Sequence, residues 1–432
     1  MVRGPRKGLA VTRVRISSDF ASGDREPMRR LRCMNSRTCR VEGIQIVQRR
    51  AVTAVLAAAA LLLTAGCSSG DEEGSDGGAN ASPSRTESGS SPGGQATEGA
   101  PPAKGSVEVV RTVAEGLNTP WGLAPLPEGG LLVSSRDEGT ITQVDTESGK
   151  KTEVGTVPGV AAAGEGGLMG LALSPEYASD HMVYAYFTSA SDNRIVRMLY
   201  DAEKPAGEQL GAPDTVFRGI PKGTNHNGGR IAFGPDKMLY AGTGERYEAE
   251  LAQDRNSTGG KILRLTPDGE PAPGNPFDSP VYSYGHRNVQ GLAWDSEKRL
   301  WASEFGQQTW DELNHIEPGD NYGWPDAEGK SDDSQFHDPV AQWGVAEASP
   351  SGIAYAEGSI WMAGLRGQRL WRIPLSGTET AADPQAFLEG EHGRLRTVVP
   401  AGGNKLWLVT SETDGRGSPE DGDDKILELE VT

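Results

Sequence analysis

The sequence predicts an all-β protein built as a six-bladed β-propeller. Short runs of alternating apolar residues are separated by Gly, Pro, Asp and Asn, which is typical of strands joined by turns. Long apolar repeats with a helical period are lacking. A unit of two apolar strands recurs at intervals of roughly 45–60 residues, the spacing of propeller blades. Because one such unit buries a single face poorly, we expect the repeats to stack around a central axis.

Each repeat consists of an apolar strand, a polar turn and a second apolar strand. The units start at Trp121, Met169, Arg230, Gln290, Ser351 and Arg396. Most units continue into a third strand, such as those expected at 141–144, 261–265 and 370–374. We expect the strands at 107–113 and 425–431 to share one blade and so to close the ring. A seventh blade is the main alternative count.

The first 66 residues are interpreted as an N-terminal extension and a lipoprotein signal peptide. Arg49 and Arg50 precede an apolar run at 51–63, and small residues follow before Cys67. The run is too short to span a bilayer permanently. Cys67 resembles the cysteine of a bacterial lipobox, so we expect lipidation there and a position on the extracytoplasmic face of the cell membrane. Simple secretion is the alternative, and the true first residue is expected near Met34 or Val47.

Residues 67–105 are rich in Gly, Ser, Pro, Glu and Thr, and they predict a disordered linker ahead of the propeller at 106–432. The whole chain has a net charge of −18, and residues 1–66 carry +9. Residues 67–432 therefore carry a net charge of about −27. An acidic mature chain of this kind disfavours nucleic acid and anionic lipid surfaces as partners. Cleavage before Cys67 would leave no other cysteine, so we expect no disulfide framework.

Candidate functional residues are expected at the ends of the innermost strands and in the loops that follow the first strands, because function in a propeller usually lies at one mouth of the central channel. His226 lies in N-H-N-G-G-R, where neighbouring glycines leave room for a ligand, so it is a candidate general base. A loop histidine bonded to backbone is the alternative. A second cluster spans 284–325, where Arg287 and Asn288 suit an anion and nearby carboxylates suit a hard cation.

Seven short motifs occur along the chain in one order. They are T-P-W-G-L-A, G-E-G-G-L-M-G-L-A, H-N-G-G-R-I-A-F-G, G-K-I-L-R-L, Y-G-H-R-N-V-Q-G-L-A-W, D-E-L-N and N-Y-G-W-P. Taken together they resemble the soluble aldose sugar dehydrogenases that depend on pyrroloquinoline quinone (PQQ), also called the glucose/sorbosone dehydrogenase family. The resemblance covers residues 106–431, and the family's six-bladed propeller agrees with the repeat count.

The resemblance implies an oxidation of an aldose to its lactone, with electrons passed to an external acceptor. His226 would take the proton of the anomeric hydroxyl while hydride passes to C5 of the quinone. Arg287 would act with Asn288 on the quinone oxygens and stabilise the charge that builds there. The other residues that the resemblance places around PQQ are Glu165, Glu245, Arg366, Arg394 and Arg396. Guanidinium groups suit the three carboxylates of PQQ.

The resemblance also implies two Ca²⁺ sites. Gly306 and Gln307 match the turn whose backbone carbonyls bind the catalytic ion, which acts as a Lewis acid on the quinone. Glu312 and Tyr322 match part of a structural site, Tyr322 through its main-chain oxygen. Asp311 and Glu312 could equally form a solvated loop pair.

Several positions depart from the family pattern. Gln307 replaces the usual Pro, Glu245 replaces Asp, Asn225 replaces an acidic residue, Glu165 stands where some members have Gln, and Arg366 stands where the family has Lys. The long insert of the glucose-oxidising branch is absent, so we expect a monomer with an open site. Two alternatives stay open: a surface-displayed binding propeller that has lost its redox role, and a metal-dependent lactonase on a similar propeller.

Overall fold

The computed structural model describes residues 32–33, 39–40 and 101–432. The chain divides into two compact units, residues 1–91 and 92–432. In the first unit, β1 (Arg32–Cys33) pairs antiparallel with β2 (Cys39–Arg40). The apolar run at 51–63, Cys67 and the linker up to residue 100 lie outside the described residues. The signal peptide, the lipid attachment and most of the linker therefore stay predictions.

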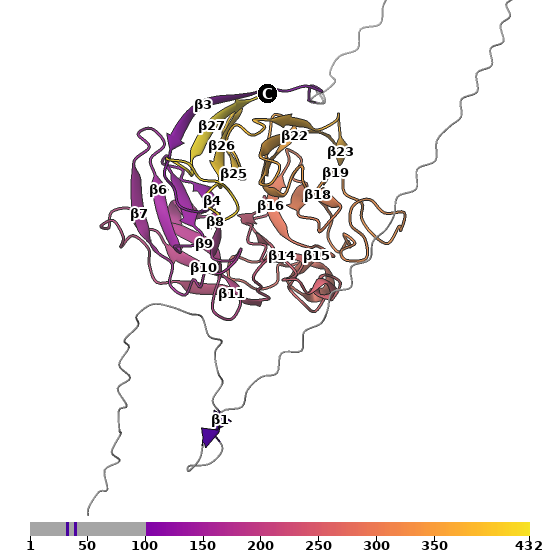
Figure 1. Ribbon diagram of the computed structural model, residues 1–432, viewed down its shortest axis with the longest axis horizontal. Coiled ribbons are helices and arrows are strands. Elements are labelled where there is room, and N and C mark those ends of the chain that lie inside the picture. Colours follow the sequence, from indigo (N-terminus) through magenta and orange to yellow (C-terminus); the bar gives the residue numbers. More distant parts are fainter. Residues whose placement is uncertain (1–31, 34–38, 41–100) are drawn as a thin grey trace, which may run out of the picture. The chain divides into compact units, whose positions relative to one another are not determined.

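The second unit is a six-bladed β-propeller, as the repeats predict (Figure 1). The first blade contains β4 (Pro120–Pro125), β5 (Leu131–Ser135), β6 (Thr140–Val144) and β7 (Lys151–Thr156). The second contains β8 (Leu168–Leu173), β9 (Met182–Thr188), β10 (Asn193–Leu199) and β11 (Asp214–Ile220). The third contains β12 (Ile231–Phe233), β13 (Leu239–Gly242), β14 (Lys261–Leu265) and β15 (Val281–Tyr284).

The remaining blades have the same antiparallel order. The fourth contains β16 (Val289–Trp294), β17 (Leu300–Glu304), β18 (Trp310–Ile316) and β19 (Ala341–Gly344). The fifth contains β20 (Pro350–Ala356), β21 (Ser359–Gly364) and β22 (Arg369–Ser376), with β23 (Glu379–Thr380) and β24 (Gln385–Phe387) both paired to β22. Helices in this unit are short: α1 (Tyr177–Asp180), η1 (Ala249–Ala252) and η2 (Pro276–Asp278).

The sixth blade joins the two ends of the folded chain. It contains β25 (Leu395–Gly402), β26 (Lys405–Thr410), β27 (Ile426–Val431) and β3 (Val107–Ala114). The outermost strand β3 pairs with β27, in a register that sets Val107 opposite Val431. The predicted closure is confirmed, and the alternative of a seventh blade is wrong. Among the described residues, no helix has the length and apolar character needed to cross a membrane.

The repeated Gly in the W-G-L-A, M-G-L-A and Q-G-L-A motifs has a packing role. Each lies on an innermost strand, and a Cβ at Gly122, Gly170 or Gly291 would collide with backbone of the next blade. The amide of Gly170, for example, donates a hydrogen bond to the carbonyl of Gly229 in the next blade, 3.0 Å away. Glycine therefore lets neighbouring first strands approach around the channel.

The apolar core lies between adjacent blades. Leu132 and Ile141 of the first blade pack in one cluster with Leu168 and Phe187 of the second, and all four are buried. Comparable clusters join the later blades. Burial of such area stabilises the fold by about 25 cal/mol per Å². The stacked blades thus hold the loops around the channel mouth on a rigid ring.

Candidate active site

A cavity of about 430 Å³ opens at one mouth of the central channel. Its walls come from two kinds of loop: those that precede the first strand of a blade and those that follow the second strand. Glu165 precedes β8, His226 precedes β12 and Arg287 precedes β16. Arg136 follows β5 and Arg366 follows β21. Residues far apart in the sequence therefore meet because equivalent ends of different blades face one axis.

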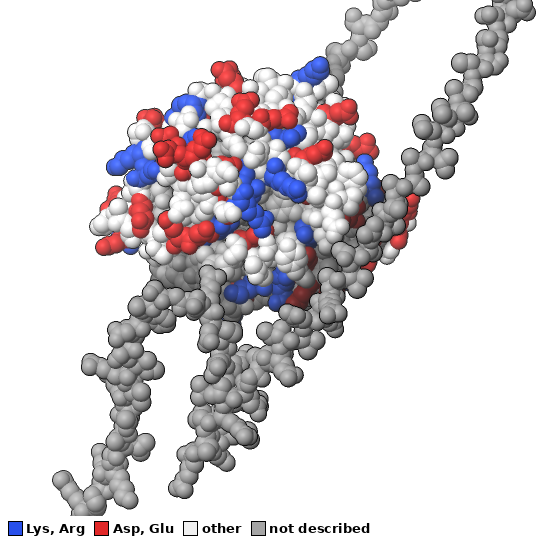
Figure 2. Space-filling view, in the orientation of Figure 1, with Lys and Arg blue, Asp and Glu red and all other residues white. Residues whose placement is uncertain are grey.

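The cavity is strongly basic. Figure 2 shows basic side chains gathered at the centre of this face. Six arginines line the cavity, namely Arg136, Arg287, Arg366, Arg394, Arg396 and Arg416. Its carboxylates are Glu165, Asp311 and Asp414. With His226 neutral, the lining carries a surplus of three positive charges, which favours a polyanionic ligand.

His226 and Glu245 form a buried pair beside the cavity. Nδ1 of His226 lies 3.0 Å and 2.9 Å from the two carboxylate oxygens of Glu245. A carboxylate accepts hydrogen bonds, so this contact places a proton on Nδ1 and leaves the lone pair of the neutral ring on Nε2. His226 is 5% exposed and Glu245 is 1% exposed, so solvent competes little for either group. The pair has the arrangement of a base held by an acid.

The backbone around this pair adopts uncommon conformations. The φ angles are 54° at His226, 52° at Arg246 and 67° at Tyr247, all in the left-handed region that side chains disfavour. Glu245 compensates by accepting a hydrogen bond from the amide of Tyr247, 2.6 Å away. The Tyr247 ring lies 4.0 Å from the His226 ring, centre to centre, and is 64% exposed. An aromatic face therefore stands at the cavity mouth beside the base.

A buried ammonium group holds the loop that carries Tyr247. Lys261 is fully buried, and its Nζ donates to the carbonyls of Leu251, Ala252 and Gly259 at 2.6, 2.9 and 2.7 Å. These three carbonyls lie in and after helix η1, and the Ala252 carbonyl also accepts from the Gly285 amide at 2.9 Å. The carbonyls of Leu251 and Gly259 have no other donor among the described residues. Through these three hydrogen bonds, Lys261 fixes the segment between β13 and β14, which carries Tyr247.

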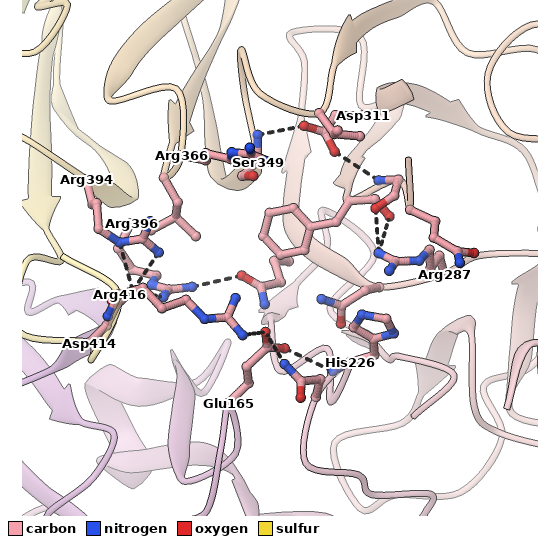
Figure 3. A pocket seen from close by; sticks show the side chains of 18 of the residues that line it. Glu165, His226, Arg287, Asp311, Ser349, Arg366, Arg394, Arg396, Asp414 and Arg416 are labelled. Atoms are coloured by element: carbon pink, nitrogen blue, oxygen red, sulfur yellow. Dashed lines mark hydrogen bonds and ion pairs between the residues drawn. The ribbon is translucent and has the colours of Figure 1, made fainter. Parts of the chain in front are cut away.

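Glu165 connects the base to the arginines. One of its oxygens accepts from the His226 amide at 3.0 Å, and the other accepts from Asn225 at 2.7 Å (Figure 3). Arg416 pairs with the same carboxylate at 2.6 Å. Burial opposes ionisation of Glu165, but Arg416 and these hydrogen bonds hold its pKa below the ordinary value. Glu165 is therefore an ionised anchor for the His226 loop.

Asp414 holds two arginines against the opposite wall. Arg394 lies 2.9 Å and Arg396 lies 3.1 Å from the same oxygen of Asp414 (Figure 3). Burial opposes ionisation of Asp414, yet Arg396 and Arg394 keep its pKa low. Burial lowers the pKa of Arg396 to about 10, and Asp414 counteracts that effect. One carboxylate for two guanidinium groups leaves this wall positively charged.

Arg287 and Asn288 each have one buried donor without a hydrogen-bond partner among the described residues. Arg287 donates from one terminal nitrogen to the carbonyls of Phe305 and Gly306, at 3.2 and 2.6 Å. Its Nε has no hydrogen-bond partner among the described residues, and the same is true of Nδ2 of Asn288. Both residues line the cavity. Buried donors without partners are costly, so a ligand with acceptor atoms fits here.

Asp311 secures the far rim. Its carboxylate accepts from the amides of Gly306 at 2.9 Å and Ser349 at 2.6 Å, which joins the fourth and fifth blades (Figure 3). Burial raises the pKa of Asp311 to about 6 despite these hydrogen bonds. Gly306 and Gln307 line the cavity beside it, and the Gly306 carbonyl is bound to Arg287.

A second, small cavity of about 10 Å³ lies next to the first. Glu304, Glu312 and Tyr322 line it together with Gly306. Glu304 and Glu312 face each other across β17 and β18. Burial and the neighbouring Glu304 raise the pKa of Glu312. The carboxylates of Glu304 and Glu312 are oxygen donors of the kind that a hard cation binds.

The structure brings most of the predicted site residues to one cavity. The nine that line it are Glu165, His226, Arg287, Asn288, Gly306, Gln307, Arg366, Arg394 and Arg396. Glu245 lies behind His226 rather than in the lining, and Glu312 and Tyr322 line the small cavity instead. Cys67 lies outside the described residues. No group of three or more His, Cys, Asp or Glu arranged for a metal occurs among residues 101–432.

Sequence reasoning missed several lining residues: Trp121, Arg136, Tyr247, Asp414 and Arg416. A signal for some of them exists in the repeat. In five of the six blades the segment after the second strand lines the cavity, which selects R-D after β5 and S-E-T-D-G-R after β26. Reading those segments as a set would have found Arg136, Asp414 and Arg416.

Comparisons with known proteins agree with this geometry. The family model for glucose/sorbosone dehydrogenases matches residues 117–418. The aldose sugar dehydrogenase YliI of Escherichia coli is 32% identical over 348 residues, covering 73% of this chain and 92% of that protein. Quinoprotein glucose dehydrogenase B of Acinetobacter calcoaceticus is 30% identical over 285 residues, covering 57% and 59%. The PQQ-bound form of an aldose sugar dehydrogenase from Streptomyces coelicolor is 80% identical, with a TM-score of 0.77, and covers 77% of this chain and all of that one.

Proposed function

The chain belongs to the glucose/sorbosone dehydrogenase family, and we propose that it acts as a PQQ-dependent sugar dehydrogenase that oxidises an aldose to its lactone. One observation carries the proposal: the His226–Glu245 pair stands beside a cavity with a surplus of three positive charges. The base suits the anomeric hydroxyl of a sugar, and the surplus charge suits the three carboxylates of the cofactor.

The described residues fit PQQ in both charge and hydrogen bonding. Arg366, Arg394 and Arg396 lie in the lining where carboxylates can reach them. Arg366 is exposed toward solvent, whereas Arg394 and Arg396 are buried with their shared Asp414. The unpartnered donors of Arg287 and Asn288 would bind the quinone oxygens. When bound, PQQ supplies the acceptor for the hydride that leaves the sugar.

His226 holds the proton chemistry. With Nδ1–H directed at Glu245, Nε2 is the atom that accepts the proton of the sugar hydroxyl. The Glu245 carboxylate then stabilises the positive imidazolium ring, as the acid of a catalytic triad does. Glu165 fixes the backbone of the base through its amide, so the ring keeps its direction when the proton arrives.

A change at Tyr247 tests how the sugar is held. We expect Tyr247→Ala to raise KM for the sugar about fivefold to tenfold while kcat changes little, because an exposed ring beside the base gives a sugar an apolar face. Steady-state kinetics with the PQQ-loaded protein measures both constants. Tyr247→Phe keeps the ring and should behave as the wild type does. An unchanged KM for Tyr247→Ala would remove Tyr247 from the sugar site.

Calcium is the second proposed cofactor. Oxygen donors from Glu304, Glu312 and the main chain of Tyr322 would hold a structural ion in the small cavity. Carbonyls of Gly306 and Gln307 would hold a second ion at the rim of the main cavity, where it would act as a Lewis acid. The Gly306 carbonyl, now bound to Arg287, would have to serve both cations.

The structural calcium site has its own test. We expect saturating Ca²⁺ to raise the Tm of the protein by several degrees, because an ion that binds only the folded state stabilises it. Glu312→Gln should lose most of that rise, whereas Glu297→Gln, on a side chain that is 72% exposed, should keep it. Scanning calorimetry with Ca²⁺ and with a chelator gives the measurement. Equal responses of the two variants would rule out Glu312 as a ligand.

The alternatives differ from this proposal in what the channel mouth must contain. A lactonase needs carboxylates and an Asn that converge on one central ion, whereas here six arginines surround the cavity. A binding propeller without redox activity would need neither Nε2 of His226 nor its partner Glu245. Three measurements separate these functions: dye reduction with several aldoses by the protein loaded with PQQ and Ca²⁺, PQQ binding by calorimetry, and a lactone hydrolysis assay. Turnover supports the dehydrogenase, PQQ binding without turnover favours the binding propeller, and lactone hydrolysis favours the lactonase.

Location and electron transfer complete the proposal. Lipidation at Cys67 would hold the propeller outside the cell membrane, with the linker at 67–105 as its tether. An external acceptor would then take electrons at the open mouth of the cavity. The apolar run and small residues before Cys67 support the lipid anchor. The solvent-facing rim of the main cavity supports access for an external electron acceptor.

A further inference from the structure

Arg230 lies beneath the floor of the main cavity. Its side chain is buried, with 7% of the residue exposed. Nε donates to the Gln290 carbonyl at 2.8 Å, and one terminal nitrogen donates to the Thr397 hydroxyl at 2.9 Å. Its guanidinium carbon lies 4.4 Å from the centre of the Trp121 ring. Trp121 and Gln290 line the main cavity, so Arg230 is one side chain below it.

Arg230 has no anionic partner among the described residues. Both of its hydrogen-bond acceptors are neutral. Burial and, to a smaller extent, the neighbouring Arg396 together lower the pKa of Arg230 to about 9. Arg396, by contrast, pairs with Asp414. A buried cation next to another cation is unfavourable unless a negative charge lies nearby.

The position of Arg230 also divides the central channel. On the side away from the main cavity, Arg230 lines an apolar cavity of about 300 Å³, which is distinct from the small cavity beside Glu312. That cavity is otherwise formed by the first strands of the blades, with apolar residues such as Leu171, Leu292 and Ile353. The apolar lining gives Arg230 no counterion from below. Any compensating charge must therefore come from the main cavity above.

We propose that Arg230 is a cofactor-positioning residue whose buried charge is compensated by the anionic PQQ bound above it. The proposal rests on the proposed function, because it requires PQQ in the main cavity. Arg230 acts through two residues that line the main cavity: it stacks on the Trp121 ring and donates a hydrogen bond to the Gln290 carbonyl. The side chain of Gln290 in turn accepts a hydrogen bond from Arg396 at 3.0 Å. Its charge adds to the attraction that Arg394 and Arg396 exert on the ligand.

The test measures PQQ affinity of the apoprotein by calorimetry. Arg230→Met should bind PQQ at least about tenfold more weakly, because one unit charge several ångströms away in a protein interior contributes on that order. Arg230→Lys keeps the charge and should recover most of the affinity. Arg372→Met is the matched control: Arg372 is fully buried, its acceptors are also neutral, and burial lowers its pKa, but it lies outside both cavities.

The outcomes separate this role from the proposed function. A wild type that binds PQQ, with weakened binding in Arg230→Met and normal binding in Arg372→Met, supports the role. Wild-type affinity in Arg230→Met, or an equal loss in Arg372→Met, would contradict it while leaving the proposed function intact. A wild type that does not bind PQQ would overturn both. Arg230→Gln, which retains two donors without the charge, gives the same comparison if Arg230→Met fails to fold.

Discussion

Replacing His226 with Gln is expected to lower kcat by about 10³, within the range of 10² to 10⁴ that general bases contribute. Glutamine is similar in size and can still donate a hydrogen bond to Glu245, but it has no basic nitrogen where Nε2 stands. In the proposed site, arginines and Asn288 of the cavity lining would supply most of the cofactor contacts, so PQQ affinity should change little. Steady-state kinetics and a PQQ titration of the same preparation measure the two effects.

His181→Gln is the control, because His181 is exposed on the loop after α1 and does not line the cavity. It should keep wild-type kinetics. If the kcat of His226→Gln stayed within about threefold of the wild type, the base would have to be another group. Asp311 would be the next candidate, because it lines the cavity and burial raises its pKa to about 6.

Glu245→Gln is also expected to have a large effect, a loss of about 10² to 10⁴ in kcat, by analogy with loss of the acid in a Ser-His-Asp triad. The amide cannot stabilise the imidazolium ring by charge, and its NH₂ group can select the wrong tautomer of His226. KM for the sugar and PQQ affinity should stay near the wild type, since Glu245 does not line the cavity.

A purely structural role of Glu245 is distinguished by Glu245→Asp, which keeps the negative charge on a shorter side chain. Because Glu245 also accepts from the Tyr247 amide, either change could loosen that loop. We expect Glu245→Asp to recover most of kcat and Glu245→Gln to recover none. Equal kcat values for the two variants would show that Glu245 serves the loop and not the base.

The fold could be predicted from the sequence because its physical requirements repeat. Each blade needs an apolar strand, a turn and a second strand, and the innermost strands need Gly122, Gly170 and Gly291 where blades approach closely. The pairing of β3 with β27 could be predicted because the first and last strands of a propeller must meet in one blade to close the ring. The outer strands β7, β11 and β24 were not predicted individually, because they pack on one side only and carry weaker patterns.

The site was predicted less completely, for geometric reasons. His226, Arg287 and Arg396 stand next to recognisable first strands, so their motifs revealed them. Arg416 and Asp414 lie in a long loop after β26, where no regular pattern shows which side chain turns inward. The role of Glu245 depends on a contact of about 3 Å between two loops that together contain three left-handed residues, which composition cannot reveal.

The central claim is that bound PQQ receives electrons from a sugar next to His226. Single-turnover absorbance spectroscopy tests it most directly: the PQQ-loaded protein is mixed with an aldose in the absence of any other electron acceptor. We expect reduction of one equivalent of PQQ per chain, at a rate that falls about 10³-fold in His226→Gln. A protein that takes up no PQQ, or whose bound PQQ stays oxidised with every aldose tested, would contradict it.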